Sequence, residues 1–321
     1  NEDHSIAHKL LVDGVREAYM DIVRKEVEQE IKKELQQMAE EKAAKVFAEN
    51  LKSALMQTPI RNKIILGLDP GYAHGCKLAV IDTNGNPLET AVIYPHPPQN
   101  KLEQAKKVLT SLIIRHGVEV IAIGNGTACK ESEILVADVI KENNFSTQYI
   151  LVNEAGASVY SASKEAAEEF PGMDTNIISA ISIARRLQDP MAELVKIDPR
   201  SLGLGQYQHD ISKKVLETEL KRVTETVVNT VGVDVNTASV QLLSHVSGLT
   251  RRSAQAIVDY IKANGKLKNR QELAKIKGLS ANAIQQAAGF LKIYGGTEPL
   301  DEYFIHPEDY PIARQIMNLI Q

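Results

Sequence analysis

The stretch from Ile64 to Gly71 constrains the fold of this chain more than any other. An apolar run of strand length ends in one carboxylate, Asp69, and Pro70 with Gly71 then forces a turn. We therefore expect Asp69 to lie at the tip of a buried strand, where a carboxylate can take part in chemistry.

The residues that follow predict a mixed α/β sheet. Lys77 to Asp82 indicates a second strand, and Asn84-Gly85-Asn86 before Leu88 to Tyr94 predicts a hairpin into a third. Val118 to Gly124 is nearly all apolar, which is typical of a strand buried on both faces of a parallel sheet, and Gln148 to Glu154 predicts a fifth strand. Helices are expected at about Lys101–Arg115, Glu131–Glu142, Ser158–Glu169 and Thr175–Leu187. The order β-β-β-α-β-α-β-α-α predicts helices on both sides of the sheet.

Length and composition indicate a soluble cytosolic protein of two or three domains. The chain has 321 residues, of which 43% are apolar, an ordinary share for a globular protein. Cys76 and Cys129 are too few for a disulfide framework or a zinc cluster, and no apolar run approaches the roughly 20 residues of a membrane span. The chain begins at Asn1 rather than Met and without a signal segment, so we expect it to be a piece of something longer.

The N-terminal segment from about His8 to Met56 predicts amphipathic helices. Apolar residues recur there every three or four positions among dense charges of both signs. Because these charges sum to about neutral, a solvated face of a helical scaffold is favoured over a nucleic-acid-binding arm. Thr58-Pro59 closes the segment.

The C-terminal third contains an internal repeat with an offset of 30 residues. Each copy predicts a helix, a short turn and a second helix, and the turn Val246–Thr250 recurs as Ile276–Ser280. The second helices are expected over Arg251–Ala263 and Ala281–Ile293. Gly265 stands where a C′ glycine would end the first pair.

The repeat is basic, although the whole chain has a net charge of −4. Between Val246 and Gly296, nine Lys and Arg face only Asp259 and Glu272, a local balance of +7. The nine are Arg251, Arg252, Lys262, Lys266, Lys268, Arg270, Lys275, Lys277 and Lys292. Such a patch indicates an acidic partner that the average charge conceals.

The two turns of the repeat are suited to binding phosphate. Gly248 or Gly278 leads into a helix capped by Thr250 or Ser280, and unpaired N–H groups at a helix N-terminus bind phosphate oxygens. Flanking cations would position a nucleic-acid backbone without reading bases. These cations are Arg251, Arg252, Lys275 and Lys277. The alternative is an ordinary pair of capped helical hairpins.

Three other features are weaker candidates. Gly203-x-Gly205 has no strand before it and no third glycine, which argues against a dinucleotide site. His74 and His96 lie in loops near strand ends and could touch a phosphate, although solvent-exposed loop histidines are favoured. The segment Gly124–Thr127 before a helix could bind an anion, or could be a tight strand-to-helix turn.

The repeat resembles the tandem helix-hairpin-helix domain, whose usual hairpin runs apolar-x-Gly-apolar-Gly. Thr250 and Ser280 replace the last glycine, a departure that would stiffen the turn and weaken the approach of a phosphate. The α/β unit resembles the ribonuclease-H-like fold in its resolvase branch, RuvC and YqgF. That fold cleaves phosphodiesters with two divalent ions held by three or four carboxylates, and the resemblance assigns Asp69 and Glu154 as the candidate metal ligands and catalytic residues.

The other acids of that cluster are missing. RuvC carries a glutamate at the end of the fourth strand, where this chain has Asn125. The family's last acid lies on the final helix, where Ser179 and Ser182 stand here, and Asp174 and Asp189 only border its ends.

Two acids alone offer little more than one weak Mg²⁺ site. In the usual strand order Asp69 and Glu154 start about 10 Å apart, because one strand separates theirs. We therefore expect Asp69 and Glu154 to be vestigial, no cofactor beyond possible weak Mg²⁺, and a catalytically inactive domain. The alternative is a metal-dependent nuclease that acts on structured nucleic acid.

A series of longer blocks extends from Gly67 to Ser239. They include Gly-Leu-Asp-Pro-Gly, Ile-Tyr-Pro-His-Pro, Ala-Ile-Gly-Asn-Gly-Thr-Ala, Asn-Glu-Ala-Gly-Ala-Ser-Val-Tyr-Ser-Ala-Ser, Ala-Arg-Arg-Leu-Gln-Asp-Pro, Gly-Gln-Tyr-Gln-His-Asp and Val-Gly-Val-Asp-Val-Asn-Thr-Ala-Ser. These blocks resemble the bacterial Tex family of transcription accessory proteins. The resemblance implies a cytoplasmic protein that binds DNA or RNA, possible contact with the transcription machinery, no membrane partner, and a YqgF-like domain without resolvase activity.

Tex-type proteins begin with a helix-turn-helix region and end in an OB-fold RNA-binding domain, and neither is complete here. The predicted organisation is therefore a helical arm over 1–60, a YqgF-like ribonuclease-H-like domain over 61–190, a helical connector over 191–235, a tandem helix-hairpin-helix over 236–296 and the start of a C-terminal segment over 297–321.

Overall fold

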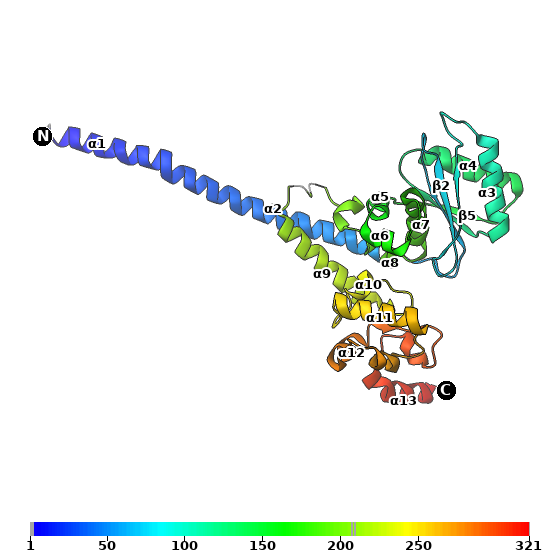
Figure 1. Cartoon of the computed structure of the whole chain (residues 1–321). Helices are drawn as coiled ribbons and strands as arrows, with labels where there is room; N and C mark the ends of the chain where they lie inside the picture. The colour runs from blue at the N-terminus through cyan, green and yellow to red at the C-terminus, as the bar shows by residue number, and fades with distance from the viewer. Residues whose placement is uncertain (1–2, 207, 209, 321) are drawn as a thin grey trace.

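The computed structural model describes residues 3–206, 208 and 210–320. It consists of a long N-terminal helix, an α/β domain and a helical C-terminal region (Figure 1). Tyr207 and His209 of the block Gly-Gln-Tyr-Gln-His-Asp lie outside the described residues, as do Asn1, Glu2 and Gln321. No helix among the described residues is long and apolar enough to cross a membrane.

The N-terminal segment is helical, as its apolar spacing predicts, and it forms one continuous rod. α1 (Asp3–Ala18), a π-helical turn (Tyr19–Val23) and α2 (Arg24–Leu55) follow one another without a break. Only the last third is covered, where Phe47, Leu51 and Leu55 pack toward α9 (Lys213–Val231). The rest of the rod projects away from the other domains (Figure 1).

The α/β domain contains a five-stranded sheet in the order β3-β2-β1-β4-β5. The strands are β1 (Ile65–Asp69), β2 (Cys76–Ile81), β3 (Pro87–Ile93), β4 (Val120–Gly124) and β5 (Gln148–Val152). β1, β4 and β5 run parallel, while β2 is antiparallel to both β1 and β3. β4 therefore lies between β1 and β5, as the ribonuclease-H-like resemblance implies.

Alternate residues of the central strands fill two separate cores. Leu66, Leu68 and Ile121 pack with α3 (Leu102–His116) and α4 (Cys129–Asn143) on one side of the sheet. Ile65 and Ala122 pack with α7 (Thr175–Gln188) on the other side (Figure 1). α7 approaches β1 so closely that a Cβ at Gly67 would lie 2.0 Å from the Ala180 carbonyl oxygen. This approach places the inward face of α7 directly against the strand that carries Asp69.

Short helices connect the sheet to the rest of the chain. They are α5 (Ala157–Ser161), α6 (Lys164–Glu169), α8 (Pro190–Leu194) and the 3-10 turn η2 (Pro199–Leu202). The helix expected over Ser158–Glu169 is interrupted, because the Ser163 hydroxyl accepts from Ala166 N–H at 3.1 Å and starts a new helix.

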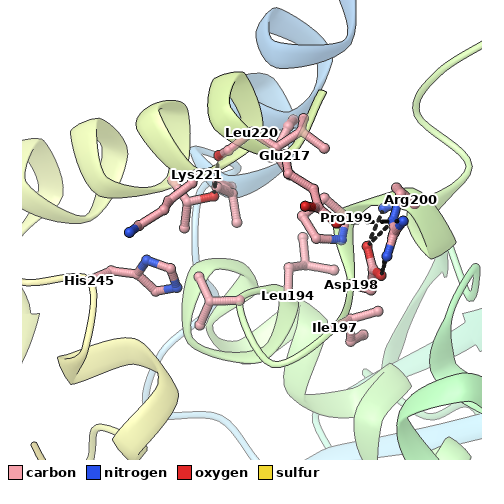
Figure 2. Close-up of a pocket in the computed structure, with 13 residues that line it drawn as sticks. Leu194, Ile197, Asp198, Pro199, Arg200, Glu217, Leu220, Lys221 and His245 are labelled. Carbon is pink, nitrogen blue, oxygen red and sulfur yellow. Dashed lines mark hydrogen bonds and ion pairs between the residues drawn. The ribbon is translucent and has the colours of Figure 1, made fainter. Parts of the chain in front are cut away.

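A cavity of about 210 Å³ lies where the rod, the segment from α8 to η2, and α9 meet (Figure 2). Its lining includes the apolar side chains of Leu51, Leu194 and Leu220 and the polar side chains of Lys221 and His245. His245 belongs to the C-terminal region, so the cavity marks the junction of the three parts of the molecule.

The C-terminal region contains the two helical hairpins. Its elements are β6 (Val233–Asp234), α10 (Val240–Leu243), α11 (Arg251–Asn264), η3 (Arg270–Lys275), α12 (Ala281–Ala287), β7 (Leu291–Lys292), η4 (Pro299–Glu302), η5 (Pro307–Asp309) and α13 (Tyr310–Ile320). Gly265 ends α11 as predicted, with its N–H donating to Ile261 O at 2.9 Å.

The helix predicted over Ala281–Ile293 is wrong beyond Ala287. The backbone instead turns and pairs in parallel with β6, where Val233 N–H donates to Phe290 O at 2.8 Å. This pairing closes the two hairpins into one unit, and periodicity within one copy of the repeat does not predict it.

Candidate nucleic-acid interface

Both hairpin turns depend on a glycine in a left-handed conformation. Gly248 has φ +85° and Gly278 has φ +98°. A Cβ at Gly248 would lie 2.6 Å from the Gln286 Cβ of α12, and one at Gly278 would lie 3.7 Å from the Ala256 Cβ of α11. Each turn therefore packs on the second helix of the other hairpin, and the turn at Gly248 is the more tightly packed.

Thr250 and Ser280 cap the helices that follow, as the sequence predicts. Thr250 and Ser253 form a reciprocal capping box: Ser253 N–H donates to Thr250 Oγ1 at 3.2 Å, and Thr250 N–H donates to Ser253 Oγ at 2.7 Å. Ser280 Oγ accepts from Ala283 N–H at 3.2 Å. The cap of α11 leaves the N–H groups of Arg251 and Arg252 without an intrahelical acceptor, so they can donate to a phosphate oxygen.

The four predicted backbone-binding cations are all exposed. Lys275 Nζ donates to Glu272 at 2.9 Å, whereas Arg251 lies 3.9 Å from Glu165 of the α/β domain. Within the described residues, Arg252 and Lys277 form no ion pair. Among the described residues, each hairpin therefore has one of these cations in an ion pair and one in none, and the ion pair of the first hairpin is the longer.

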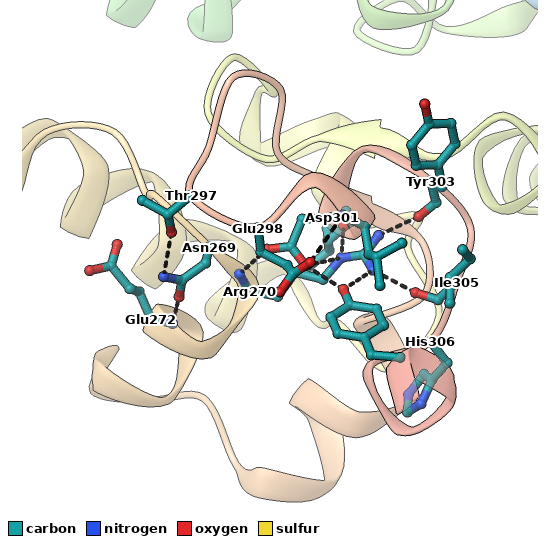
Figure 3. Close-up of polar contacts among 12 residues, drawn as sticks. Asn269, Arg270, Glu272, Thr297, Glu298, Asp301, Tyr303, Ile305 and His306 are labelled. Atoms are coloured by element: carbon teal, nitrogen blue, oxygen red, sulfur yellow. Dashed lines mark hydrogen bonds and ion pairs between the residues drawn. The ribbon is translucent and has the colours of Figure 1, made fainter. Parts of the chain in front are cut away.

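The local balance of +7 overstates the basic surface, because Arg270 is buried with 3% exposure. Its guanidinium donates to the carbonyl oxygens of Leu291, Tyr303 and Ile305 at 2.6–2.7 Å, and its backbone N–H donates to Asp301 at 2.7 Å (Figure 3). Arg270 thus holds the C-terminal segment onto the hairpins and is not part of a phosphate-binding surface.

Lys292 is a second internal cation. Its ammonium donates to Val231 O at 2.9 Å and lies 4.0 Å from the centroid of the Phe304 ring. Burial lowers the pKa of Lys292. The other seven basic side chains of the patch are exposed: Arg251, Arg252, Lys262, Lys266, Lys268, Lys275 and Lys277.

Sequence reasoning missed Asn229, which orients the first turn. Its side-chain amide donates to His245 O at 3.0 Å, and its Oδ1 accepts from Ser247 N–H at 2.9 Å. Asn229 therefore ties α9 to the residues just before Gly248. The available signal in the sequence was Asn229 itself, a polar residue next to the apolar residues Val227 and Val228 of α9.

The structure brings Asp69 and Glu154 close enough to influence one another. Burial, followed by the nearby Glu154 carboxylate, raises the pKa of Asp69 to about 6, and Lys77 opposes this shift. Lys77 is also the residue opposite Asp69 in the β1–β2 pairing. A cation thus lies near the first carboxylate.

Glu154 is enclosed by the turn after β4. A Cβ at Gly126 would lie 1.7 Å from Glu154 Oε1, so the carboxylate fills the space that an anion would take in the Gly124–Thr127 turn. Burial raises the pKa of Glu154, while a hydrogen bond from Gly126 N–H and the charge of Arg186 oppose this. Asn125 Oδ1 accepts from Glu154 N–H at 3.2 Å. This side chain therefore orients the backbone at Glu154 and adds no charge to the site.

Arg186 of α7 holds the loop after β5, which carries Glu154. It is 5% exposed, and its Nη1 donates to the carbonyl oxygens of Asn153 and Ala155 at 2.7 and 2.8 Å. Burial lowers the pKa of Arg186 to about 10. The second carboxylate therefore also has a fixed cation nearby, a feature that sequence reasoning missed.

The inward face of α7 carries serines, as predicted. Ser179 Oγ donates to Ser161 Oγ at 3.2 Å, and Ser182 is fully buried. Asp174 and Asp189 are helix caps that accept from Asn176 N–H at 2.9 Å and Ala192 N–H at 3.0 Å.

This donor set does not fit a two-ion cluster. Within the part of the chain that the structure describes, no group of three or more His, Cys, Asp or Glu could hold a metal ion. Lys77 and Arg186 already provide positive charge beside the two carboxylates. A pair of divalent ions would need further carboxylates to offset its charge.

His96 corrects a further expectation, because it is not a solvent-exposed loop histidine. It is 6% exposed, its Nε2 lies 3.1 Å from Ser132 Oγ, and its ring meets Tyr72 edge to face at 5.9 Å. Burial lowers the pKa of His96. His74 is exposed, as expected.

The fold and these sites define a class of protein that joins a YqgF-type ribonuclease-H-like domain to a tandem helix-hairpin-helix. Residues 63–188 match the family model described as the Tex protein YqgF-like domain, and residues 228–292 match the helix-hairpin-helix motif.

Two curated relatives cover nearly the whole chain. Uncharacterized protein YdcI of Bacillus subtilis is 48% identical over 96% of this chain, and transcriptional accessory protein Tex of Neisseria gonorrhoeae is 46% identical over 98%. The chain belongs to the Tex family. It spans 43% and 41% of the lengths of these two relatives.

A solved structure of Thermus thermophilus RuvC in complex with Holliday junction substrate is also similar to part of the chain. It shares 15% identity with a TM-score of 0.29, over 38% of this chain and 90% of that one.

Proposed function

We propose that this chain is a nucleic-acid-binding scaffold of the Tex type. The first hairpin is the main support for this proposal. The backbone N–H groups and the exposed guanidinium groups of Arg251 and Arg252 all lie at the N-terminus of α11. Backbone N–H groups and cations contact phosphates rather than base edges, so the binding is independent of sequence.

The Neisseria relative supports a role beside the transcription machinery, because its name is transcriptional accessory protein. Nearly all of this chain aligns with that relative. We propose the same association here, with the hairpins holding nucleic acid and the remaining surfaces free for protein contacts.

We also propose that the ribonuclease-H-like domain does not cleave phosphodiesters. Two carboxylates remain, and Lys77 and Arg186 stand beside them. Mg²⁺ in the millimolar range should therefore leave the melting temperature of the chain unchanged, whereas a metal site would raise it by mass action.

Salt titration tests the binding proposal. The affinity for a fluorescent duplex DNA, a single-stranded DNA and a single-stranded RNA should fall linearly in log–log form with salt, with a slope magnitude of about 2 to 4 for contacts to that many phosphates. Scrambling the base order should leave the affinities unchanged. Binding that resists salt, or that depends on base order, would contradict the proposal.

A metal-dependent nuclease is the rival function, and one observation favours it: Asp69 and Glu154 do lie within electrostatic reach of each other. Incubation with branched DNA and single-stranded RNA plus Mg²⁺ or Mn²⁺ separates the two functions. We expect no cleavage above that of an Asp69→Asn variant prepared in the same way. Cleavage that Asp69→Asn abolishes would establish the rival function.

A further inference from the structure

The two edges of the five-stranded sheet differ in chemistry. At the β5 edge, Tyr149, Ile150 and Leu151 are 38%, 43% and 46% exposed, and the run from Asn144 to Asn153 contains no charged residue. β5 pairs regularly with β4, without a bulge. A regularly paired, uncharged and apolar edge is a ready template for another strand.

The opposite edge, β3, carries the features that usually prevent such pairing. Its pairing with β2 has an irregular register at Val80/Ile81, it begins with Pro87, and Glu89 accepts from Arg115 at 2.6 Å and lies 2.6 Å from His116 Nε2. Proline, bulges and charges all disfavour edge-to-edge association. The absence of these features at β5, within the described residues, is therefore a local property of that edge.

The register of β5 fixes which backbone groups face outward. Gln148 N–H donates to Glu119 O, and Val152 O accepts from Asn125 N–H, both at 3.0 Å, so the even-numbered residues bond toward β4. Tyr149 and Leu151 therefore direct their backbone N–H and C=O groups away from the sheet. Only an extended strand can satisfy this alternation of donors and acceptors.

We propose that two copies of this chain associate through antiparallel pairing of their β5 strands, with the two-fold axis at Ile150. In that register Tyr149 of each copy lies opposite Leu151 of the other, on the same face. At both ends of the paired segment Thr147 lies opposite Asn153, with the Thr147 side chain buried and donating to Val118 O at 2.9 Å. The strand is thus complementary to itself, as a two-fold interface requires.

A second copy fits this edge better than a foreign charged peptide does. The run 144–153 offers no charge to recognise such a peptide and none to repel another copy, and the neighbouring Glu133 carboxylate accepts from the Tyr149 hydroxyl at 3.4 Å. Aromatic and aliphatic cross-strand pairs favour antiparallel association. Because five residues per chain form a small interface, the association is weak and depends on protein concentration.

Disulfide trapping tests the register. Across the two-fold axis the two Ile150 residues form a non-hydrogen-bonded pair, whose Cα atoms lie about 4.5 Å apart, within disulfide reach. In a Cys129→Ser background, Ile150→Cys should form a covalent dimer under mild oxidation. Val92→Cys on the β3 edge is the matched control, with 41% exposure of Val92 against 43% for Ile150, and should remain monomeric. Equal cross-linking of the two variants, or none in Ile150→Cys, would overturn the proposal.

Sedimentation velocity over a concentration series tests the non-covalent contact. The unmodified chain should show a monomer–dimer equilibrium, and Leu151→Lys should weaken it by about tenfold or more, with an unchanged circular-dichroism melt. An unmodified chain that sediments as a monomer at every concentration would overturn the proposal. So would a Leu151→Lys variant that associates as strongly as the unmodified chain.

Discussion

Asp69 occupies the position of a catalytic carboxylate but has the surroundings of a structural one. The strand, the turn and the second carboxylate, Glu154, are all present. However, Lys77 is the cross-strand neighbour of Asp69, and the Arg186 charge lies near Glu154. The sequence predicted the carboxylates and the missing acids. It could not predict the two cations, because both arise from register and helix packing rather than from a motif.

Replacing Asp69 with Asn should stabilise the chain near neutral pH. Because the folded pKa of Asp69, about 6, is raised above that of the unfolded chain, folded protein holds the proton more tightly. Stability associated with this group is therefore full at low pH and is lost as pH rises through about 6. Asp69→Asn removes that loss, which corresponds to about 3 kcal/mol at pH 7.5. Denaturant unfolding of both proteins from pH 4 to pH 8 measures the difference, and parallel curves would contradict it.

Gly248 should tolerate substitution less than Gly117, a left-handed glycine with open space around it. Gly248→Ala would strain a residue with φ +85° and press its Cβ to 2.6 Å from Gln286. We expect a loss of about 2 kcal/mol or more in unfolding free energy. Gly117→Ala is the control, because Gly117 also has positive φ but has nothing within 4 Å. An equal cost at the two positions would show that packing at the first turn does not matter.

At the scale of elements, local patterns predicted most helices and strands, and long-range contacts produced the errors. The 30-residue offset correctly located both turns and their caps. It wrongly extended the helix that begins at Ala281 to Ile293, because the repeat itself does not indicate the pairing of β7 with the distant β6. The charge count likewise treated Arg270 as surface charge, although three carbonyl oxygens bind its guanidinium inside the fold and Asp301 accepts from its backbone N–H.

The two hairpins should contribute unequally to nucleic-acid binding. Lys275 already donates to Glu272, and α12 is much shorter than α11. Arg251→Gln with Arg252→Gln should lower the affinity for duplex DNA by about tenfold and the salt slope by about two. Lys275→Gln with Lys277→Gln should have the smaller effect. Fluorescence anisotropy at several salt concentrations measures both, and a larger loss from the lysine pair would reverse the order.

At the scale of the whole molecule, the chain combines three parts with different charge and exposure. The basic hairpins lie at one end, the α/β domain forms a separate body, and the helical rod projects from their junction (Figure 1). Sequence patterns predicted the kinds and order of these parts. The junction cavity near His245 and the Arg251–Glu165 contact could not be predicted, because they join segments far apart in the chain.

Charge reversal at the hairpin turns tests the central claim most directly. One variant changes four residues to Glu, namely Arg251, Arg252, Lys275 and Lys277. A control variant makes the same change in net charge on exposed lysines of the rod, namely Lys32, Lys33, Lys42 and Lys45. Titration of fluorescent duplex DNA and single-stranded RNA should show that the hairpin variant no longer binds while the rod variant binds nearly as tightly as the unmodified chain. Equal binding by the two variants would contradict the claim that the hairpins hold the nucleic acid.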